Sequence, residues 1–329
     1  MTKPSQHTLK DSHALPIRLG ISRCLIGEPV RYDGGHKHDP FLVDVLGKHV
    51  EWVPVCPEVE SGLGTPREAM RLVGDPNNPR LLTIRSRRDQ SPRLLQSAKQ
   101  RITDLSKLKI VGYVFKKDSP SCGIQRVRVY NSDGALIGRG QGLFAQAFQT
   151  AFPLIPIEEE GRLQDLSLRE NFIERVFGYH RWQSLTYQKK FSRRALVDFH
   201  TQHKYLLLAH SRSHYHQLGQ LVDDANIHST KELRDSYGKV FMEALKVKAT
   251  VSKHVKVLEQ IAGHFKAYLG KREGGELQEI IQDYHQQLVP LNVPLTLIRH
   301  YANLFEVPHL QNQTYLNPHP QELMLRNPA

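Results

Sequence analysis

The sequence predicts an α/β domain with a Rossmann-like parallel sheet, followed by a domain made only of helices. Two observations support this fold class. Up to about residue 152, short β-branched apolar runs alternate with helical segments, which is the pattern of a sheet built from βαβ units. From residue 171 onward, apolar residues recur at intervals of three and four, which indicates amphipathic helices. The expected helices span residues 94–108, 141–152, 169–185, 193–211, 236–247, 251–269, 275–288 and 294–305.

Four segments are expected along the chain. Residues 1–15 are polar and are expected to be a disordered lead-in without a secretory signal. Residues 16–157 are expected to form the α/β domain, and the acidic segment 158–170 a linker. Residues 171–329 are expected to form the helical domain, in which KREGG at 271–275 separates two helices. The tail after Pro308 is expected to be irregular.

Three short apolar runs are rich in β-branched residues and are closed by Gly or Pro, which predicts buried parallel strands. They occupy residues 17–21, 50–55 and 110–115. The only three cysteines of the chain follow these runs one by one: Cys24, Cys56 and Cys122. Ligands of open α/β sheets collect at the carboxyl ends of such strands, so the three thiols could converge on one site. Their spacing fits no zinc ribbon, CxxC redox pair or disulfide framework.

Composition limits the class of protein. The formal net charge is +12, and both halves of the chain are basic. An odd number of cysteines without a secretion signal is typical of cytoplasmic proteins, in which thiols stay reduced. No stretch reaches the roughly 18 apolar residues of a membrane span. The positive charge is compatible with an ordinary soluble protein and equally with a protein that binds RNA or DNA.

Chemistry alone leaves the nature of the thiol site open. Three buried cysteines that never meet are one interpretation. Zinc held by three cysteines and a histidine is another, because His36 and His38 lie close to Cys24 in the sequence. Three cysteines on an iron–sulfur cluster are a third, and the iron without a protein ligand could then act as a Lewis acid.

Four motifs surround the cysteines in order: SRCLIG, VRYDGG, PVCPEVESGLGTPREAM and DSPSCG. Together they resemble the thiouracil/thiouridine desulfidase family over about residues 16–155. The resemblance implies a [4Fe–4S] cluster bound by Cys24, Cys56 and Cys122, with one open iron. The helical half, with RENFIERVFGYHRW and FHTQHKYLLLAHS, resembles a second family of formerly unknown function that is often fused to the first. Two-domain members are associated with 4-thiouridine in tRNA, whereas short members act on free thiouracil.

The resemblance suggests a hydrolytic reaction without net redox change, in which a thiocarbonyl becomes a carbonyl and sulfide is released. Such a reaction needs a proton carrier and groups that orient the base. Glu58 is the expected proton carrier, although it could simply be an acidic residue at a helix N-terminus. Ser119 and Ser121 are expected to orient the pyrimidine or the attacking water, or else to cap a turn. Asp33 is an alternative base, but in YDGG it favours an Asx-turn.

A tRNA substrate requires cationic side chains that contact phosphates. The expected RNA-binding residues are Arg85, Arg87, Arg88, Arg93, Lys189, Lys190, Arg193 and Arg194. Two other functions remain open from the sequence. The first is a desulfidase of free thiouracil or thionucleotides. The second is a nucleic-acid-binding regulatory protein whose cysteines bind zinc or sense redox state.

Overall fold

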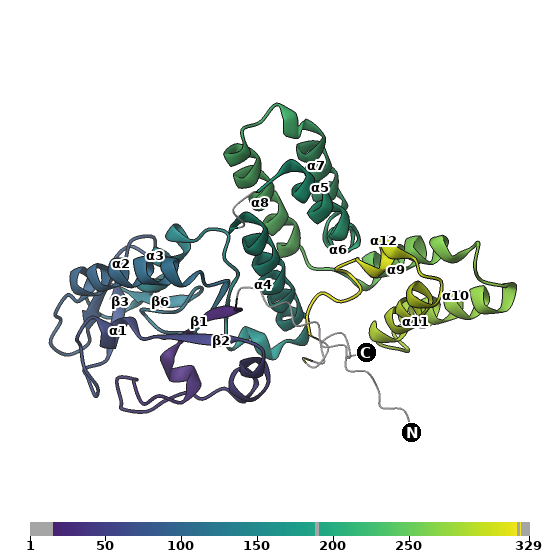
Figure 1. Cartoon of the computed structure of the whole chain (residues 1–329). Helices are drawn as coiled ribbons and strands as arrows, with labels where there is room; N and C mark the ends of the chain where they lie inside the picture. The colour runs from purple at the N-terminus through teal and green to yellow at the C-terminus, as the bar shows by residue number, and fades with distance from the viewer. Residues whose placement is uncertain (1–15, 188–190, 321–322, 324–329) are drawn as a thin grey trace, which may run out of the picture.

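The computed structural model describes residues 16–187, 191–320 and 323 (Figure 1). The predicted lead-in at 1–15 lies outside the described residues. The predicted fold class is confirmed, because a parallel-sheet α/β domain is followed by helices. No described helix is both long and apolar enough to cross a membrane.

The sheet that carries the cysteine loops has four parallel strands in the order β2-β1-β5-β8. Its strands are β1 (Arg18–Ser22), β2 (Glu51–Val55), β5 (Gly112–Phe115) and β8 (Ile157–Glu159). The three predicted strands are therefore confirmed, and they are neighbours in the sheet. Strand β5 is buried along its whole length, as expected for a central parallel strand covered on both faces.

The prediction of a linker at 158–170 is wrong, because both ends of this segment belong to regular secondary structure. Its first residues belong to β8, which pairs with β5, and helix α4 (Leu166–Tyr187) begins before it finishes. The acidic residues of β8 are buried because they have partners: the backbone N–H of Ile124 donates to Glu159 at 2.8 Å. Arg162 donates to Glu158 at 2.7 Å. A run of acidic residues resembles an exposed connector in the sequence, and only these tertiary contacts make it a strand.

A second four-stranded sheet, with the order β4-β3-β6-β7, was not predicted. Its strands are β3 (Met70–Val73), β4 (Arg80–Thr83), β6 (Val127–Tyr130) and β7 (Leu136–Gly140). Only β3 and β6 are parallel, and the two outer pairs are antiparallel. These strands are short, β6 alternates buried with exposed residues, and β7 has no buried residue, so the second sheet lacks the continuous apolar runs that revealed the first.

Two helices cover one side of the α/β domain, and both were predicted: α2 (Ser91–Leu108) and α3 (Leu143–Ala151). Their apolar side chains share one core with side chains from both sheets. Tyr113 and Phe115 of β5 stack at 3.9 Å between ring centroids, and Phe148 of α3 meets both rings edge-on. This aromatic core fixes β5, and with it the loop that carries Cys122.

Helix α4 covers the opposite side of the first sheet. Phe172, Ile173, Val176 and Phe177 pack with the buried residues of β1 and β5. The other end of the same helix contributes Trp182 to the core of the helical region. In Figure 1, α4 connects the α/β domain to the remaining helices. It therefore belongs to two cores at once.

The helical region continues through eight further α-helices among the described residues. They are α5 (Arg193–Gln202), α6 (Lys204–His210), α7 (Arg212–Asp223), α8 (Thr230–Lys246), α9 (Val251–Ala262), α10 (Lys271–His285), α11 (Asn292–Leu304) and α12 (Pro308–Gln311). The predicted helix at 193–211 is divided at His203. The predicted break at 271–275 is wrong, since KREGG forms the first turns of α10 after Gly270 as N-cap. The tail begins with the short helix α12 rather than with irregular chain.

Candidate functional site

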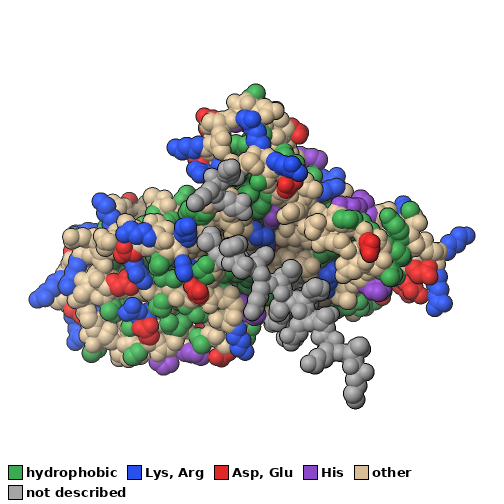
Figure 2. Space-filling view, in the orientation of Figure 1, with side chains coloured by type: hydrophobic (Ala, Val, Ile, Leu, Met, Phe, Trp, Pro, Cys, Tyr) green, Lys and Arg blue, Asp and Glu red, His purple; other side chains and the backbone are tan. Residues whose placement is uncertain are grey.

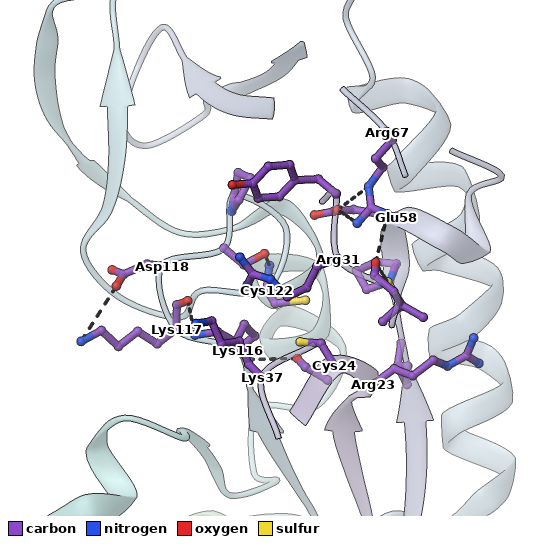
Figure 3. Close-up of a pocket in the computed structure, with 18 residues that line it drawn as sticks. Arg23, Cys24, Arg31, Lys37, Glu58, Arg67, Lys116, Lys117, Asp118 and Cys122 are labelled. Atoms are coloured by element: carbon purple, nitrogen blue, oxygen red, sulfur yellow. Dashed lines mark hydrogen bonds and ion pairs between the residues drawn. The ribbon is translucent and has the colours of Figure 1, made fainter. Parts of the chain in front are cut away.

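The three cysteines line one cavity at the carboxyl ends of β1, β2 and β5. The cavity has a volume of about 330 Å³ and includes Cys24, Cys56 and Cys122 in its wall. Figure 3 shows the sulfur atoms of Cys24 and Cys122 turned toward the same space. Adjacent parallel strands end at the same edge of a sheet, which is why residues so far apart in the sequence meet here.

Each cysteine is held by local backbone structure. Cys24 lies in a 3₁₀ turn, Arg23–Ile26, that ends at Gly27 with φ of 92°. Cys56 is the N-cap of α1 (Pro57–Glu60), whose first residue is proline. The Cys122 loop lies against the start of α3, where the backbone N–H of Gly142 donates to the carbonyl of Gly123 at 2.8 Å. A Cβ at Gly142 would lie 2.5 Å from the Ser121 backbone, so this contact requires glycine.

The cysteines are reduced and buried. Burial raises the pKa of Cys24 to about 11, and it also raises the pKa of Cys56 and of Cys122. The nearby thiols oppose one another's ionisation, while Lys116 and Arg31 lower the pKa of Cys24 in part. The polypeptide alone therefore favours neutral thiols, and a positively charged metal centre would shift all three toward the thiolate that binds metal.

Three thiols converge on the cavity, and thiolates are ligands of both zinc and iron–sulfur clusters. A tetrahedral zinc site, with Zn–S of about 2.3 Å, needs its ligands within about 4 Å of one another. Among the described residues, no group of three or more His, Cys, Asp or Glu side chains is placed to hold a metal ion. His36 and His38 are exposed and do not line the cavity, so neither of the two histidines that the zinc interpretation named completes the site. Three soft thiols spread around a larger cavity suit a cluster.

Glu58 also lines this cavity, from helix α1. Its Oε1 accepts a hydrogen bond from Ser121 Oγ at 2.7 Å, and its Oε2 accepts one from Arg67 Nε at 2.8 Å. Two of the predicted site residues, Glu58 and Ser121, are thus in direct contact across 63 positions of sequence. Ser121 itself is fully buried and is not part of the cavity wall, so it contacts the carboxylate rather than the cavity.

The other polar candidates have structural contacts. Ser119 lines the cavity, and its Oγ accepts hydrogen bonds from the backbone N–H groups of Cys122 at 3.1 Å and Ser121 at 3.3 Å. It therefore caps the turn that carries the thiol. Asp33 accepts from the backbone N–H of Gly35 at 3.0 Å, which is the Asx-turn, and this bond lowers the pKa of Asp33.

Cationic side chains surround the thiols, and sequence reasoning missed them. The lining includes Arg23, Arg31, Lys37, Arg67, Lys116 and Lys117, against only two acidic residues, Glu58 and Asp118 (Figure 3). Lys116 is paired with Glu160, and Arg31 lies 3.5 Å from Asp33. The motifs contained a partial indication of these cations, because Arg31 lies in VRYDGG and Arg67 in TPREAM. That the six cations meet around the thiols depends on the fold.

The predicted RNA-binding residues that the structure describes lie away from this cavity. Arg85, Arg87 and Arg88 are exposed on the turn after β4, and Arg93 on α2 donates to the Gly62 carbonyl at 2.9 Å. Arg193 and Arg194 begin α5, whereas Lys189 and Lys190 lie outside the described residues. In Figure 2, Lys and Arg side chains are spread over both parts of the molecule without one continuous basic stripe on the face in view. Of this predicted set, none of the six residues that the structure describes lines the thiol cavity.

Fold and site together define an α/β protein with a three-cysteine cavity, joined by a shared helix to an all-α region. Comparison with known families identifies both parts. The 2-thiouracil desulfurase family matches residues 19–160, and a family described as "Protein of unknown function (DUF1722)" matches residues 204–320. The chain belongs to the thiouracil desulfidase family and carries the second, helical domain fused to it.

Individual relatives match one part each. "Uncharacterized protein YbgA" of Escherichia coli (strain K12) is 31% identical over 156 residues, which is 46% of this chain and 90% of that protein. "Uncharacterized protein YbbK" of Bacillus subtilis (strain 168) is 26% identical over 108 residues, 31% of this chain and 71% of that protein. Among solved structures, the "[4Fe-4S]-dependent thiouracil desulfidase TudS" is 29% identical with a TM-score of 0.39. That match covers 46% of this chain and 97% of TudS.

Proposed function

We propose that this protein is a tRNA 4-thiouridine desulfidase that converts the thiocarbonyl of the base to a carbonyl and releases sulfide. The convergence of Cys24, Cys56 and Cys122 on one cavity carries the proposal. These thiols would hold a [4Fe–4S] cluster, and the absence of a fourth cysteine in the sequence would leave one iron open. Such an iron would supply a Lewis acid for a soft thiocarbonyl sulfur.

Glu58 is the proton acceptor in this proposal. It takes one proton from water as the water oxygen bonds to C4 of the ring. The C–S bond then breaks as this proton and the remaining hydroxyl proton pass to the sulfur, which leaves as hydrogen sulfide while the carbonyl forms. No electron is gained or lost. Ser121 and Arg67 are positioning residues, because they donate to different oxygens of Glu58 and so fix the plane of its carboxylate.

The charge of the cavity favours a substrate that carries phosphate. Free thiouracil is uncharged and gains no ion pair from Arg31, Lys37 and Lys117 in the wall of the cavity. A nucleotide within RNA, in contrast, presents phosphates next to the base. Tyr32 lines the cavity with 45% of its surface exposed, which leaves a ring face on which a pyrimidine can stack. The target base would have to turn out of the RNA to enter.

The second candidate is a desulfidase of free thiouracil or a thionucleotide. The match of residues 19–160 to the 2-thiouracil desulfurase family favours it. In the tRNA reaction the helical region would add RNA contacts to a basic chain, and this favours the first candidate.

One anaerobic experiment separates these functions. Purified protein is expected to be brown, with about four irons and four sulfides per chain. Sulfide release is then measured with tRNA that contains 4-thiouridine, with 4-thiouridine monophosphate and with 2-thiouracil. Faster release from tRNA than from either small molecule supports the proposal, and release from thiouracil alone assigns the second candidate. A colourless protein loaded with zinc would overturn both and support the regulatory interpretation.

A further inference from the structure

A second cavity of about 490 Å³ lies beside the thiol cavity, on the second sheet. The two share Asp118 and Pro120 in their walls, so they adjoin each other. Strands β3 and β6 supply most of the lining of this groove, and Ile84, 43% exposed, lies at its side. The opposite face of the same strands is buried in the core with α2 and α3. The groove therefore opens on the uncovered face of the sheet.

Three arginines form a row across this uncovered face. Arg128 of β6 is paired directly with Arg139 of β7. Arg71 of β3 precedes Leu72, just as Arg128 precedes Val129, and Leu72 and Val129 are partners in the sheet. The three side chains thus lie on adjacent strands, which are about 4.8 Å apart. Like charges placed opposite each other destabilise a sheet, so the row favours binding of an anion.

The row has little to neutralise it. None of the three guanidinium groups has an ion pair with Asp or Glu among the residues that the structure describes. In addition, Arg71 Nε is buried and lacks a hydrogen-bond partner in that part of the chain. The Arg71 guanidinium lies 5.1 Å from the centre of the Tyr130 ring, which also lines the groove. Cations and an aromatic ring on an open sheet are the elements of a surface that binds single-stranded nucleic acid.

We infer that this face of the second sheet binds the single-stranded RNA segment next to the target nucleotide. The arginine row holds phosphates and Tyr130 stacks on a base, while the target base enters the adjoining thiol cavity. The inference rests on the proposed function for the identity of that target. The exposed Arg87 donates to the carbonyl of Ser132, in the turn between β6 and β7, so the predicted arginine cluster lies beside this face and extends it.

The test neutralises the row in the full-length protein, as Arg71→Gln, Arg128→Gln and Arg139→Gln together. The matched control removes three exposed cations of the helical region, as Arg212→Gln, Lys231→Gln and Arg272→Gln. Binding is measured by fluorescence anisotropy with a short single-stranded RNA that contains 4-thiouridine, at several salt concentrations. Loss of three phosphate contacts is expected to weaken binding by at least tenfold and to lower the salt slope by about 2. The control is expected to change both quantities less.

Sulfide release in the same samples separates this inference from the proposed function. The row variant is expected to raise KM for the RNA while kcat/KM for 4-thiouridine monophosphate stays within twofold of the unaltered protein. Unchanged RNA affinity in the row variant overturns the inference, whatever the activity. If the unaltered protein releases no sulfide but the row variant still loses RNA affinity, the proposed function fails and the RNA surface stands. Displacement of the RNA by poly-glutamate at equal charge would assign the row to an acidic protein and overturn the inference.

A second variant keeps the test independent of net charge. Tyr130→Leu preserves apolar volume but removes the stacking surface, and it is expected to weaken binding of the RNA by about tenfold. An RNA of abasic nucleotides should not distinguish Tyr130→Leu from the unaltered protein. If the abasic RNA binds Tyr130→Leu more weakly than the unaltered protein, the proposal that a base stacks on Tyr130 is wrong.

Discussion

Removal of the helical region is expected to unfold the α/β domain as well. The change is a chain that ends after residue 160, where the match to the desulfurase family ends. It deletes α4, whose Phe172, Ile173, Val176 and Phe177 are at most 7% exposed and cover β1 and β5. At about 1.5–3 kcal/mol for each buried side chain, their loss removes about 6–12 kcal/mol of stabilisation. That equals the whole free energy of unfolding of a typical domain, about 5–15 kcal/mol.

The measurement is urea unfolding followed by circular dichroism. A chain that ends after residue 187 retains α4 and is expected to unfold cooperatively, whereas the chain that ends after residue 160 is not. In the full chain, Phe172→Ala is expected to lower the free energy of unfolding by about 3–5 kcal/mol. Leu166→Ala on the same helix is the matched control, because Leu166 is 47% exposed, and its effect should stay within about 0.5 kcal/mol. A cooperative transition in the shorter chain, at the same midpoint as in the longer one, would refute the assignment of α4 to both cores.

Three further predictions concern the site and the helical region. Ser121→Ala removes the hydrogen bond to Glu58, about 1.5–3 kcal/mol for a charged acceptor, and should lower kcat for sulfide release by about 10- to 150-fold with iron content unchanged. Lys37→Gln should raise KM for tRNA by up to about fivefold, the scale of an exposed ion pair, without changing KM for thiouracil. Burial and Arg181 hold the pKa of His203 well below its usual range, so the folded protein keeps this side chain neutral. In the unfolded chain His203 binds a proton below about pH 6.5, so the free energy of unfolding should fall by up to about 1.4 kcal/mol per pH unit below that value. The fall should be smaller in His203→Gln. Melting temperatures measured across this pH range check the difference.

Each of these predictions has an outcome that contradicts it. Unchanged turnover in Ser121→Ala would mean that the orientation of Glu58 does not matter to the reaction. An equal rise in KM for tRNA and thiouracil in Lys37→Gln would remove the argument for a phosphate contact. Identical pH profiles for His203→Gln and the unaltered protein would assign the acid sensitivity to other groups.

The sequence alone predicted three strands of the first sheet because β1 and β5 are mostly buried and apolar, and because β2 is apolar after its first residue. The same signal failed for the second sheet, where one face is open and residues such as Arg128 interrupt the apolar pattern. It failed again at β8, because Glu158 and Glu159 are acidic residues whose burial depends on partners elsewhere in the chain. Local composition therefore predicts a strand well when its side chains are apolar. It fails when polar side chains are buried by hydrogen bonds to residues elsewhere in the chain.

For the site, the sequence by itself determined the three cysteines, their places after strands and the presence of Glu58 and Ser121 in neighbouring motifs. It could not show that Ser121 donates to Glu58, that Arg67 holds the other oxygen, or that cations such as Lys37 and Lys116 surround the thiols. Motifs record which residues follow one another along the chain. Which residues face one another is decided by the order β2-β1-β5, because that order brings three distant loops to one edge of the sheet.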